Sequence, residues 1–250
     1  MIRRIHHAGI VVERLSTAYA FYRDVLGLPL LRQAEIADQG VRAALLAAGD
    51  SEIELLEPLR ADDGVGRFLA TRGEGLHHVC FDTPDVASDL DDLARRGVDL
   101  LDRQPREGLA GRIAFLHPRA CDGVLVELAT PPSHHDDGQS QVRLKRLVIG
   151  SRDVGTTSAR FQALFGFPEM ALNSGPRSML AVGRGALLIV PDEEVGGIDG
   201  MVALSLVAED FPALMQRFDA AGVKAMRGTG EVTVEPQSSH GVHLHISRYE

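Results

Sequence analysis

Two histidines and two glutamates stand at matching points of two similar stretches of this 250-residue chain. His7 lies on a strand-like segment that opens the first stretch and Glu54 on one that closes it, while His78 and Glu127 occupy the same places in the second. Two imidazoles and two carboxylates suit an octahedral or five-coordinate site for Co, Ni, Mn, Zn or Fe(II) with open positions. Each residue alone could be a buried histidine or an arginine-paired glutamate, but the matched placement of all four favours a metal site.

The elements that must position these residues recur along the chain. Segments 5–12 and 76–81 are strand-like, and each precedes an amphipathic helix, predicted over about 16–26 and about 85–96. Gly27 and Gly97 follow the last apolar residues of these helices as stop signals. Short strands come next, and the closing ones are 52–56 and 124–128. Each unit is therefore a strand, a helix and three further strands.

The same order returns in the second half of the chain. Strand-like segments 147–150 and 202–207 precede helices predicted over about 153–165 and about 210–221. We therefore predict an α+β protein with tandem domains, each made of two βαβββ units that form a cupped mixed sheet. The predicted boundaries are a metal-binding domain over 1–133, a turn-rich linker over 134–140 and a second domain over 141–250. Both domains are long enough to bury a core.

Strand alternation assigns the neighbouring polar residues to faces of the sheet. If His7 and His78 point inward, His6 and His77 point to the opposite face as hydrogen-bonded or exposed groups. Cys80 shares the face of His78 and could line the site, although a buried cysteine usually behaves as a small apolar residue rather than a ligand. The chain has only one other cysteine, which excludes a disulfide scaffold and a multi-cysteine zinc module.

Composition limits the partners of the protein. The formal net charge of −9 argues against a sequence-independent grip on nucleic acid, which needs a basic surface. No apolar run approaches the ~18–20 residues of a membrane helix, and the first seven residues lack the apolar core of a signal peptide. We therefore expect a cytoplasmic protein that acts on a small molecule, with no nucleic-acid or membrane partner.

The residues around the four ligand candidates resemble the vicinal oxygen chelate (glyoxalase/bleomycin resistance/extradiol dioxygenase) superfamily. Within it, residues 1–130 resemble the methylmalonyl-CoA epimerase family, most specifically through Phe-Leu-His-Pro at 115–118 ahead of Gly-Val-Leu-Val-Glu-Leu at 123–128. The other matching stretches are 7–12, 21–28, 52–59 and 73–79. The resemblance implies that both domains are vicinal-oxygen-chelate domains. It places the metal ligands at His7, Glu54, His78 and Glu127 and favours cobalt among the divalent metals.

The resemblance also implies a reaction, the epimerisation of methylmalonyl-CoA or a related 2-substituted malonyl thioester through a metal-stabilised enolate. It gives Glu127 the roles of ligand and catalytic base, and Glu54 is the best available candidate for the second base. The family's second-base glutamate aligns with Ala43, so the second base stays open. Three alternatives in the same superfamily also stay open: a glyoxalase I-type lyase, an extradiol dioxygenase and a small-molecule-binding resistance protein.

The second half keeps the scaffold of the repeat but not its ligands. The residues aligned, in order, with the four ligand candidates are Arg146, Leu188, Ala203 and His245. One histidine cannot replace four ligands, so we predict a degenerate domain without a metal site. His243 could share a strand face with His245, and a His-His-Asp-Asp string occupies 134–137. We expect neither to form a functional site.

The duplication itself predicts how the halves associate. Single-domain relatives of this type commonly pair as homodimers, and fusion of a duplicated copy makes such pairing intramolecular, at high effective concentration. The second half would then serve as a built-in partner for the first. We expect either a monomer with pseudo-dimeric halves or a homodimer.

Overall fold

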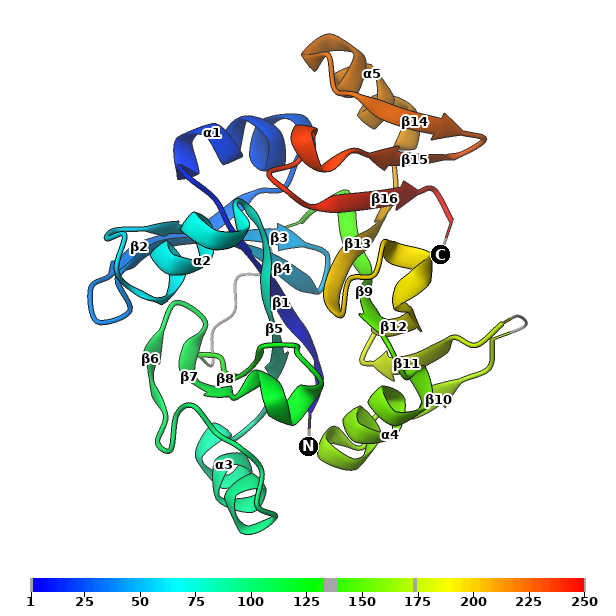
Figure 1. Ribbon diagram of the computed structural model, residues 1–250. Helices are drawn as coiled ribbons and strands as arrows, with labels where there is room; N and C mark the ends of the chain where they lie inside the picture. The colour runs from blue at the N-terminus through cyan, green and yellow to red at the C-terminus, as the bar shows by residue number, and fades with distance from the viewer. Residues whose placement is uncertain (1, 133–138, 173–174, 250) are drawn as a thin grey trace. The chain divides into compact units, whose positions relative to one another are not determined.

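The computed structural model describes residues 2–132, 139–172 and 175–249, so 134–138 of the predicted linker lie outside the described residues (Figure 1). Its strands form two eight-stranded sheets, ordered β2-β3-β4-β1-β5-β8-β7-β6 and β10-β11-β12-β9-β13-β16-β15-β14. The second order equals the first with every strand number raised by eight. The sheets are therefore two copies of one topology, which confirms the predicted α+β fold of repeated βαβββ units.

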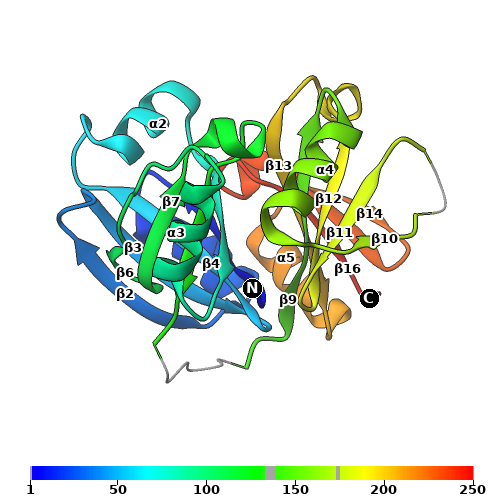
Figure 2. The same ribbon diagram turned by 90° about the horizontal axis from the view of Figure 1, so that it is seen from below.

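The first sheet and its helices come from the first half of the chain. Their elements are β1 (Arg4–Val11), α1 (Leu15–Tyr19), the π-helix η1 (Ala20–Val25), β2 (Leu30–Ile36), β3 (Val41–Ala48), β4 (Ser51–Pro58), α2 (Gly64–Arg72), β5 (Gly75–Asp82), α3 (Val86–Arg95), β6 (Arg106–Gly108), β7 (Gly111–Leu116), the 3₁₀ helix η2 (Pro118–Cys121) and β8 (Val126–Thr130). Helix α3 lies across β7 and β8 (Figure 2) and buries Val86, Leu90 and Leu93.

The second sheet repeats this order. Its elements are β9 (Val142–Ser151), α4 (Val154–Phe165), β10 (Glu169–Met170), β11 (Ser178–Val182), β12 (Gly185–Pro191), the 3₁₀ helix η3 (Asp192–Val195), β13 (Gly200–Ala208), α5 (Phe211–Ala221), β14 (Ala225–Gly228), β15 (Glu231–Val234), the 3₁₀ helix η4 (Pro236–Ser238) and β16 (His243–Ser247). Among the described residues, no helix has both the length and the apolar character needed to cross a bilayer.

Local signals explain the start and end of three repeat helices. Asp85, Asp153 and Asp210 are the N-cap residues of α3, α4 and α5, and each carboxylate accepts a hydrogen bond from a backbone N–H in the first turn. Gly166 and Gly222 follow α4 and α5 in the left-handed conformation that glycine adopts without a steric penalty. These helices are confirmed within one residue of the predicted ends.

The first repeat helix departs from the prediction of a single helix over 16–26. Its second part is a π-helix, in which the Leu26 N–H donates to the Phe21 carbonyl at 2.8 Å. At the start of α1, the N-cap residue forms no capping hydrogen bond through its side chain. The carboxylate of Glu57, from β4, accepts the Leu15 N–H at 2.7 Å instead. The short helix α2 was not predicted, because Gly64 and Gly66 weaken the helical pattern of its sequence.

Contacts divide the chain into two compact units, each built from both halves of the repeat. Unit 1 comprises Met1–His7, His78–His135 and Arg146–Val202, and unit 2 comprises Ala8–His77, Asp136–Lys145 and Ala203–Glu250. The second half therefore contributes to both units. The predicted domain boundary at 134–140 refers to the two copies of the sequence repeat rather than to these compact units, and it stays a prediction.

In unit 1, aromatic rings join the two halves. Phe81 of β5 packs against Phe165 and Phe167, with ring centroids 5.3 and 5.1 Å apart. Nearby, the Arg96 guanidinium donates to the carbonyl of Leu164 at 3.3 Å. The end of α4 is thus anchored on the first half by apolar packing and by a capping hydrogen bond.

In unit 2, a buried hydrogen bond and a contact between a histidine and a carboxylate join the halves. The Tyr22 phenol donates to the Ser239 carbonyl at 2.8 Å, and burial raises the pKa of Tyr22, so the phenol remains a donor. Beside it, Nδ1 of His240 lies 2.9 and 3.0 Å from the two carboxylate oxygens of Glu74. Within each unit, therefore, specific contacts tie the second half to the first.

The close approach of Gly241 to Glu74 gives a test of this association. We expect Gly241→Ala to destabilise the protein more than Gly222→Ala, because an added Cβ at 241 would overlap the Glu74 carbonyl, whereas no heavy atom lies within 4 Å at 222. Both glycines have positive φ, +78° and +66°, so both variants bear a backbone cost of about 1–2 kcal/mol. The overlap adds ~1–3 kcal/mol at 241 alone.

Urea unfolding of both variants measures the difference. Equal losses of unfolding free energy in Gly241→Ala and Gly222→Ala would show that the close approach of the Glu74 and Gly241 backbones does not contribute to stability.

Candidate metal centre

The register of the first sheet brings His78 and Glu127 to one face. Strands β5 and β8 pair in parallel, with Cys80 opposite Glu127. His78 is two residues before Cys80, so its side chain points to the same face of the sheet, and that of His77 to the other. Cys80 is fully buried on that face.

His7, His78 and Glu127 converge on one point within unit 1. The two Nε2 atoms lie 2.9 Å apart, and Oε2 of Glu127 lies 3.0 Å from the His7 nitrogen and 3.3 Å from the His78 nitrogen. The three residues are 0%, 2% and 3% exposed. Three potential ligand atoms thus face one another at a buried position.

The separations test whether a metal ion fits these donors. Two adjacent ligands of a six-coordinate ion with bonds of about 2.1 Å stand about 3 Å apart. The three observed separations, 2.9, 3.0 and 3.3 Å, lie close to that value. Nitrogen and carboxylate donors also suit Co, Ni, Mn, Zn and Fe(II). The residues present therefore fit a divalent cation.

The charge state of Glu127 favours a cation at this point. Burial by itself raises the pKa of the carboxyl group, but hydrogen bonds from His7 and His78 outweigh burial and hold the pKa of Glu127 well below its ordinary value. The carboxylate is therefore ionised at neutral pH. A buried negative charge beside two imidazole nitrogens is stabilised by a positive ion.

Glu54 lies on β4 in unit 2, where its side chain is buried with 6% exposure. Among the described residues of unit 1, the buried side chains of His6, His7 and Cys80 form a group that could hold a metal ion. Ala43, at the position of the family's second-base glutamate, is fully buried on β3 and presents only a methyl group.

His6 supports the site in a way that strand alternation did not predict. Its Nδ1 lies 2.9 Å from Nδ1 of His7, and both rings are fully buried. This contact occupies the nitrogen of His7 that faces away from His78, so Nε2 is the atom presented to Glu127. A hydrogen bond to the second ring nitrogen is the usual way in which a ligating histidine is oriented. The only sequence signal was the His-His pair itself.

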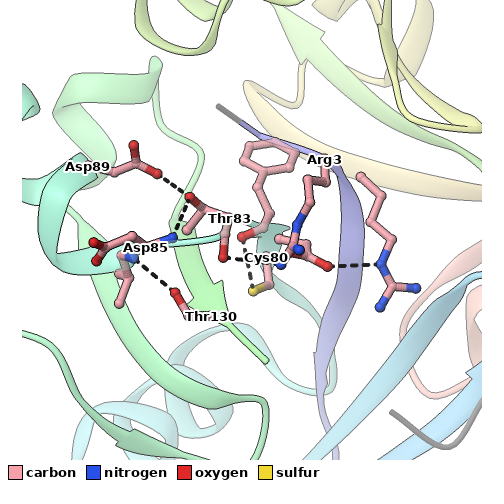
Figure 3. Close-up of polar contacts among 10 residues, drawn as sticks. Arg3, Cys80, Thr83, Asp85, Asp89 and Thr130 are labelled. Carbon is pink, nitrogen blue, oxygen red and sulfur yellow. Dashed lines mark hydrogen bonds and ion pairs between the residues drawn. The ribbon is translucent and has the colours of Figure 1, made fainter. Parts of the chain in front are cut away.

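Asp82 holds the strands that carry His7 and His78. Its carboxylate accepts hydrogen bonds from Arg3 at 2.8 Å and Arg4 at 3.1 Å, which joins the start of β1 to the end of β5. Directly after this point the Thr83 hydroxyl contacts Asp89 of α3, as Figure 3 shows. A buried carboxylate with two arginine partners resists separation of the strands.

The second sheet repeats the register but not the donors. Ser205 pairs with His245 in the same relation as Cys80 with Glu127, so His245 stands at the place of Glu127 and Ala203 at that of His78. The His245 ring is partly exposed and contacts the carboxylate of Glu231 at 3.2 Å. The other two aligned positions carry Arg146 and Leu188.

Comparison with known proteins finds relatives for the first half. A family model described as the glyoxalase/bleomycin resistance protein/dioxygenase superfamily matches residues 6–115. The chain is 35% identical over 127 residues to mitochondrial methylmalonyl-CoA epimerase of Mus musculus, which covers 50% of this chain and 71% of that protein. A solved structure of Streptomyces coelicolor methylmalonyl-CoA epimerase with 2-nitronate-propionyl-CoA has 42% identity and a TM-score of 0.52, covering 53% of this chain and 100% of the other.

One solved structure matches nearly the whole chain. A variant of 4-hydroxymandelate synthase from Streptomyces coelicolor gives a TM-score of 0.74 and covers 98% of this chain and 92% of the other, at 17% identity. At that identity the likeness concerns the fold alone. It agrees with the tandem arrangement of two vicinal-oxygen-chelate domains, whereas the epimerase matches cover about half of the chain.

The donor set predicts one metal ion per chain, and His78→Ala tests it. We expect this variant to lose the metal after gel filtration, because a partial ligand set binds a divalent cation much more weakly. The matched control is His245→Ala, which removes the histidine at the Glu127 position of the second sheet and should keep full occupancy. Elemental analysis of both variants gives the metal-to-protein ratio.

Two tightly bound ions per wild-type chain would contradict the prediction. So would full occupancy in the double variant His7→Ala with His78→Ala.

Proposed function

We propose that this chain, which belongs to the glyoxalase/bleomycin resistance protein/dioxygenase superfamily, is a metal-dependent epimerase of methylmalonyl-CoA or a related 2-substituted malonyl thioester. The observation that carries the proposal is the convergence of His7, His78 and Glu127 within the part of the chain that matches methylmalonyl-CoA epimerases. The identity to those enzymes supports the substrate class.

We propose His7, Glu54, His78 and Glu127 as the metal ligands. The burial of Glu54 supports its inclusion, together with its place in the repeat, which matches that of Glu127. A bound divalent cation would polarise the thioester carbonyl and stabilise the negative charge that develops when the α-proton leaves.

Glu127 is the proposed base on one face of the α-carbon. Its contacts to both imidazoles are made by Oε2, and we propose that the other oxygen of the same carboxylate accepts the proton. Coordination of a cation lowers the basicity of a carboxylate. With a cation bound, Glu127 would therefore have to loosen its coordination to act as the base.

Epimerisation also requires proton delivery from the opposite face. Ala43 has no group that can accept or release a proton, so the second base must come from elsewhere. Glu54 occupies the same place in the first βαβββ unit as Glu127 in the second, and we propose that Glu54, or a water that it holds, serves the opposite face. The two glutamates then exchange the roles of acid and base when the reaction reverses.

Proton exchange at the α-carbon tests the reaction class. When metal-loaded protein is incubated with methylmalonyl-CoA in deuterated water, we expect deuterium to enter C2 during conversion between the epimers. Proton NMR follows the loss of the C2 proton signal. No exchange with fully metal-loaded protein would reject epimerisation. Under the same conditions, turnover of a hemithioacetal would favour a glyoxalase I-type lyase instead.

Glu127→Gln separates metal binding from proton transfer. An amide is nearly isosteric with the carboxylate but cannot accept the α-proton. We expect epimerisation to fall by ~10²–10⁴-fold while much of the metal is retained. Coupled kinetic assays and elemental analysis on the same preparation check both expectations, and Glu107→Gln, at an exposed position of β6, is the matched control. Wild-type activity in Glu127→Gln would remove Glu127 as the base.

Glu54→Gln addresses the second base. We expect the two directions of proton exchange to be affected unequally, so that one epimer still exchanges its C2 proton with retention of configuration. Separate exchange assays from each epimer measure this asymmetry. If both directions remain near the wild-type rate, Glu54 acts only as a ligand.

A further inference from the structure

One face of the four strands β6, β7, β8 and β5 extends from the metal centre to an arginine. Arg106 pairs with Ile113 across β6 and β7, and two residues further along β7 Phe115 pairs with Glu127 of β8. Cross-strand partners share a face, as do residues two apart on a strand. Arg106, Phe115 and Glu127 therefore lie on the same face as His78.

The aromatic ring of Phe115 stands between Arg106 and the metal centre. It meets the His78 ring edge to face, with centroids 5.4 Å apart and an interplanar angle of 82°. The guanidinium carbon of Arg106 lies 5.5 Å from the Phe115 centroid. This is the geometry of a cation–π contact, which orients the cation over the ring without neutralising it. The positive group is thus one aromatic ring away from a proposed metal ligand.

Asp102 fixes the direction of the Arg106 guanidinium. Its Oδ2 lies 3.2 Å from Nε of Arg106 and also accepts the backbone N–H of Phe115 at 2.9 Å. This ion pair engages Nε, and the two terminal nitrogens have no hydrogen-bond partner among the described residues, so they can serve as a fork for another partner. The Arg106 side chain is 34% exposed, so a ligand from solvent can reach that fork.

We propose that Arg106 binds an oxyanion of the acyl-thioester substrate, either its carboxylate or a phosphate of its carrier. The guanidinium fork matches the paired oxygens of both groups and binds them through charge-assisted hydrogen bonds. The chain as a whole carries a net charge of −9, so an anionic substrate needs a local cation near the site. The proposal rests on the proposed function for the identity of the substrate.

The alternative is a purely structural role, in which Arg106 ties β6 to β7 through Phe115 and Asp102. The two roles differ in what a substitution changes. Substitution of an arginine with a structural role changes the stability of the protein but not its affinity for a particular ligand. Substitution of an arginine that binds the ligand lowers the affinity for one ligand class, and lysine restores part of that affinity.

Equilibrium binding to metal-loaded full-length protein tests the proposal with two probes. Propionyl-CoA carries the phosphates but no free carboxylate, and methylmalonyl-pantetheine carries the carboxylate but no phosphates. We expect Arg106→Ala to weaken one of the two by ~10–100-fold, as loss of a charge-assisted hydrogen bond does. Arg106→Lys should recover part of that loss. Calorimetry gives both dissociation constants, and thermal melts report stability.

The matched control is Arg112→Ala. Arg112 lies on β7 opposite Glu107, on the other face of the same hairpin, and should bind both probes like the wild type. Weaker binding of propionyl-CoA alone in Arg106→Ala assigns a phosphate, and weaker binding of methylmalonyl-pantetheine alone assigns the carboxylate.

Unchanged affinity for both probes in Arg106→Ala would overturn the proposal, whatever the change in melting temperature. Equal weakening by Arg112→Ala would overturn it as well, and so would failure of the wild type to bind either probe. Wild-type binding that depends on Arg106, without deuterium exchange at C2, would reject the epimerase function while leaving the oxyanion site intact.

Discussion

The mutual approach of His7, His78 and Glu127 is the constraint on which the rest of the structure depends. Three polar side chains held within 3.3 Å of one another and excluded from water are costly unless their lone pairs and charge are compensated. Support therefore surrounds them. His6 occupies the far nitrogen of the His7 ring, and Asp82, with its arginine partners, holds the strands that deliver both histidines.

The second half of the chain repeats the topology and register of the first but carries other residues at the donor positions. The register at His245 equals that at Glu127, but a partly exposed imidazole beside Glu231 replaces the buried carboxylate. What the second half keeps is packing. The Tyr22 phenol on the Ser239 carbonyl and the Phe81 ring on Phe165 are contacts that the first half could not satisfy alone. Loss of such buried partners would expose apolar and polar groups together.

Side chains of different polarity follow one another along the face shared by His78, Phe115 and Arg106. The buried donors lie at one end, an aromatic ring stands beside them, and a partly exposed cation lies beyond the ring. Such an order suits a substrate with a reacting centre that must be shielded from water and a charged group that need not be. The aromatic ring separates the guanidinium from the donors, which limits repulsion between it and a bound cation.

The sequence by itself determined the repeat, the α+β fold, the positions of α3, α4 and α5, and the face on which Glu127 and His78 meet. These features follow from local signals, such as aspartate caps, glycine stops and strand alternation. Only the tertiary structure decided the π-helix after α1, the contact of His6 with His7, and the position of Arg106 over Phe115. Each of these features depends on strand pairing or packing between residues far apart in the chain, or on the rotation of one side chain. The spacing of nearby residues in the sequence encodes none of these.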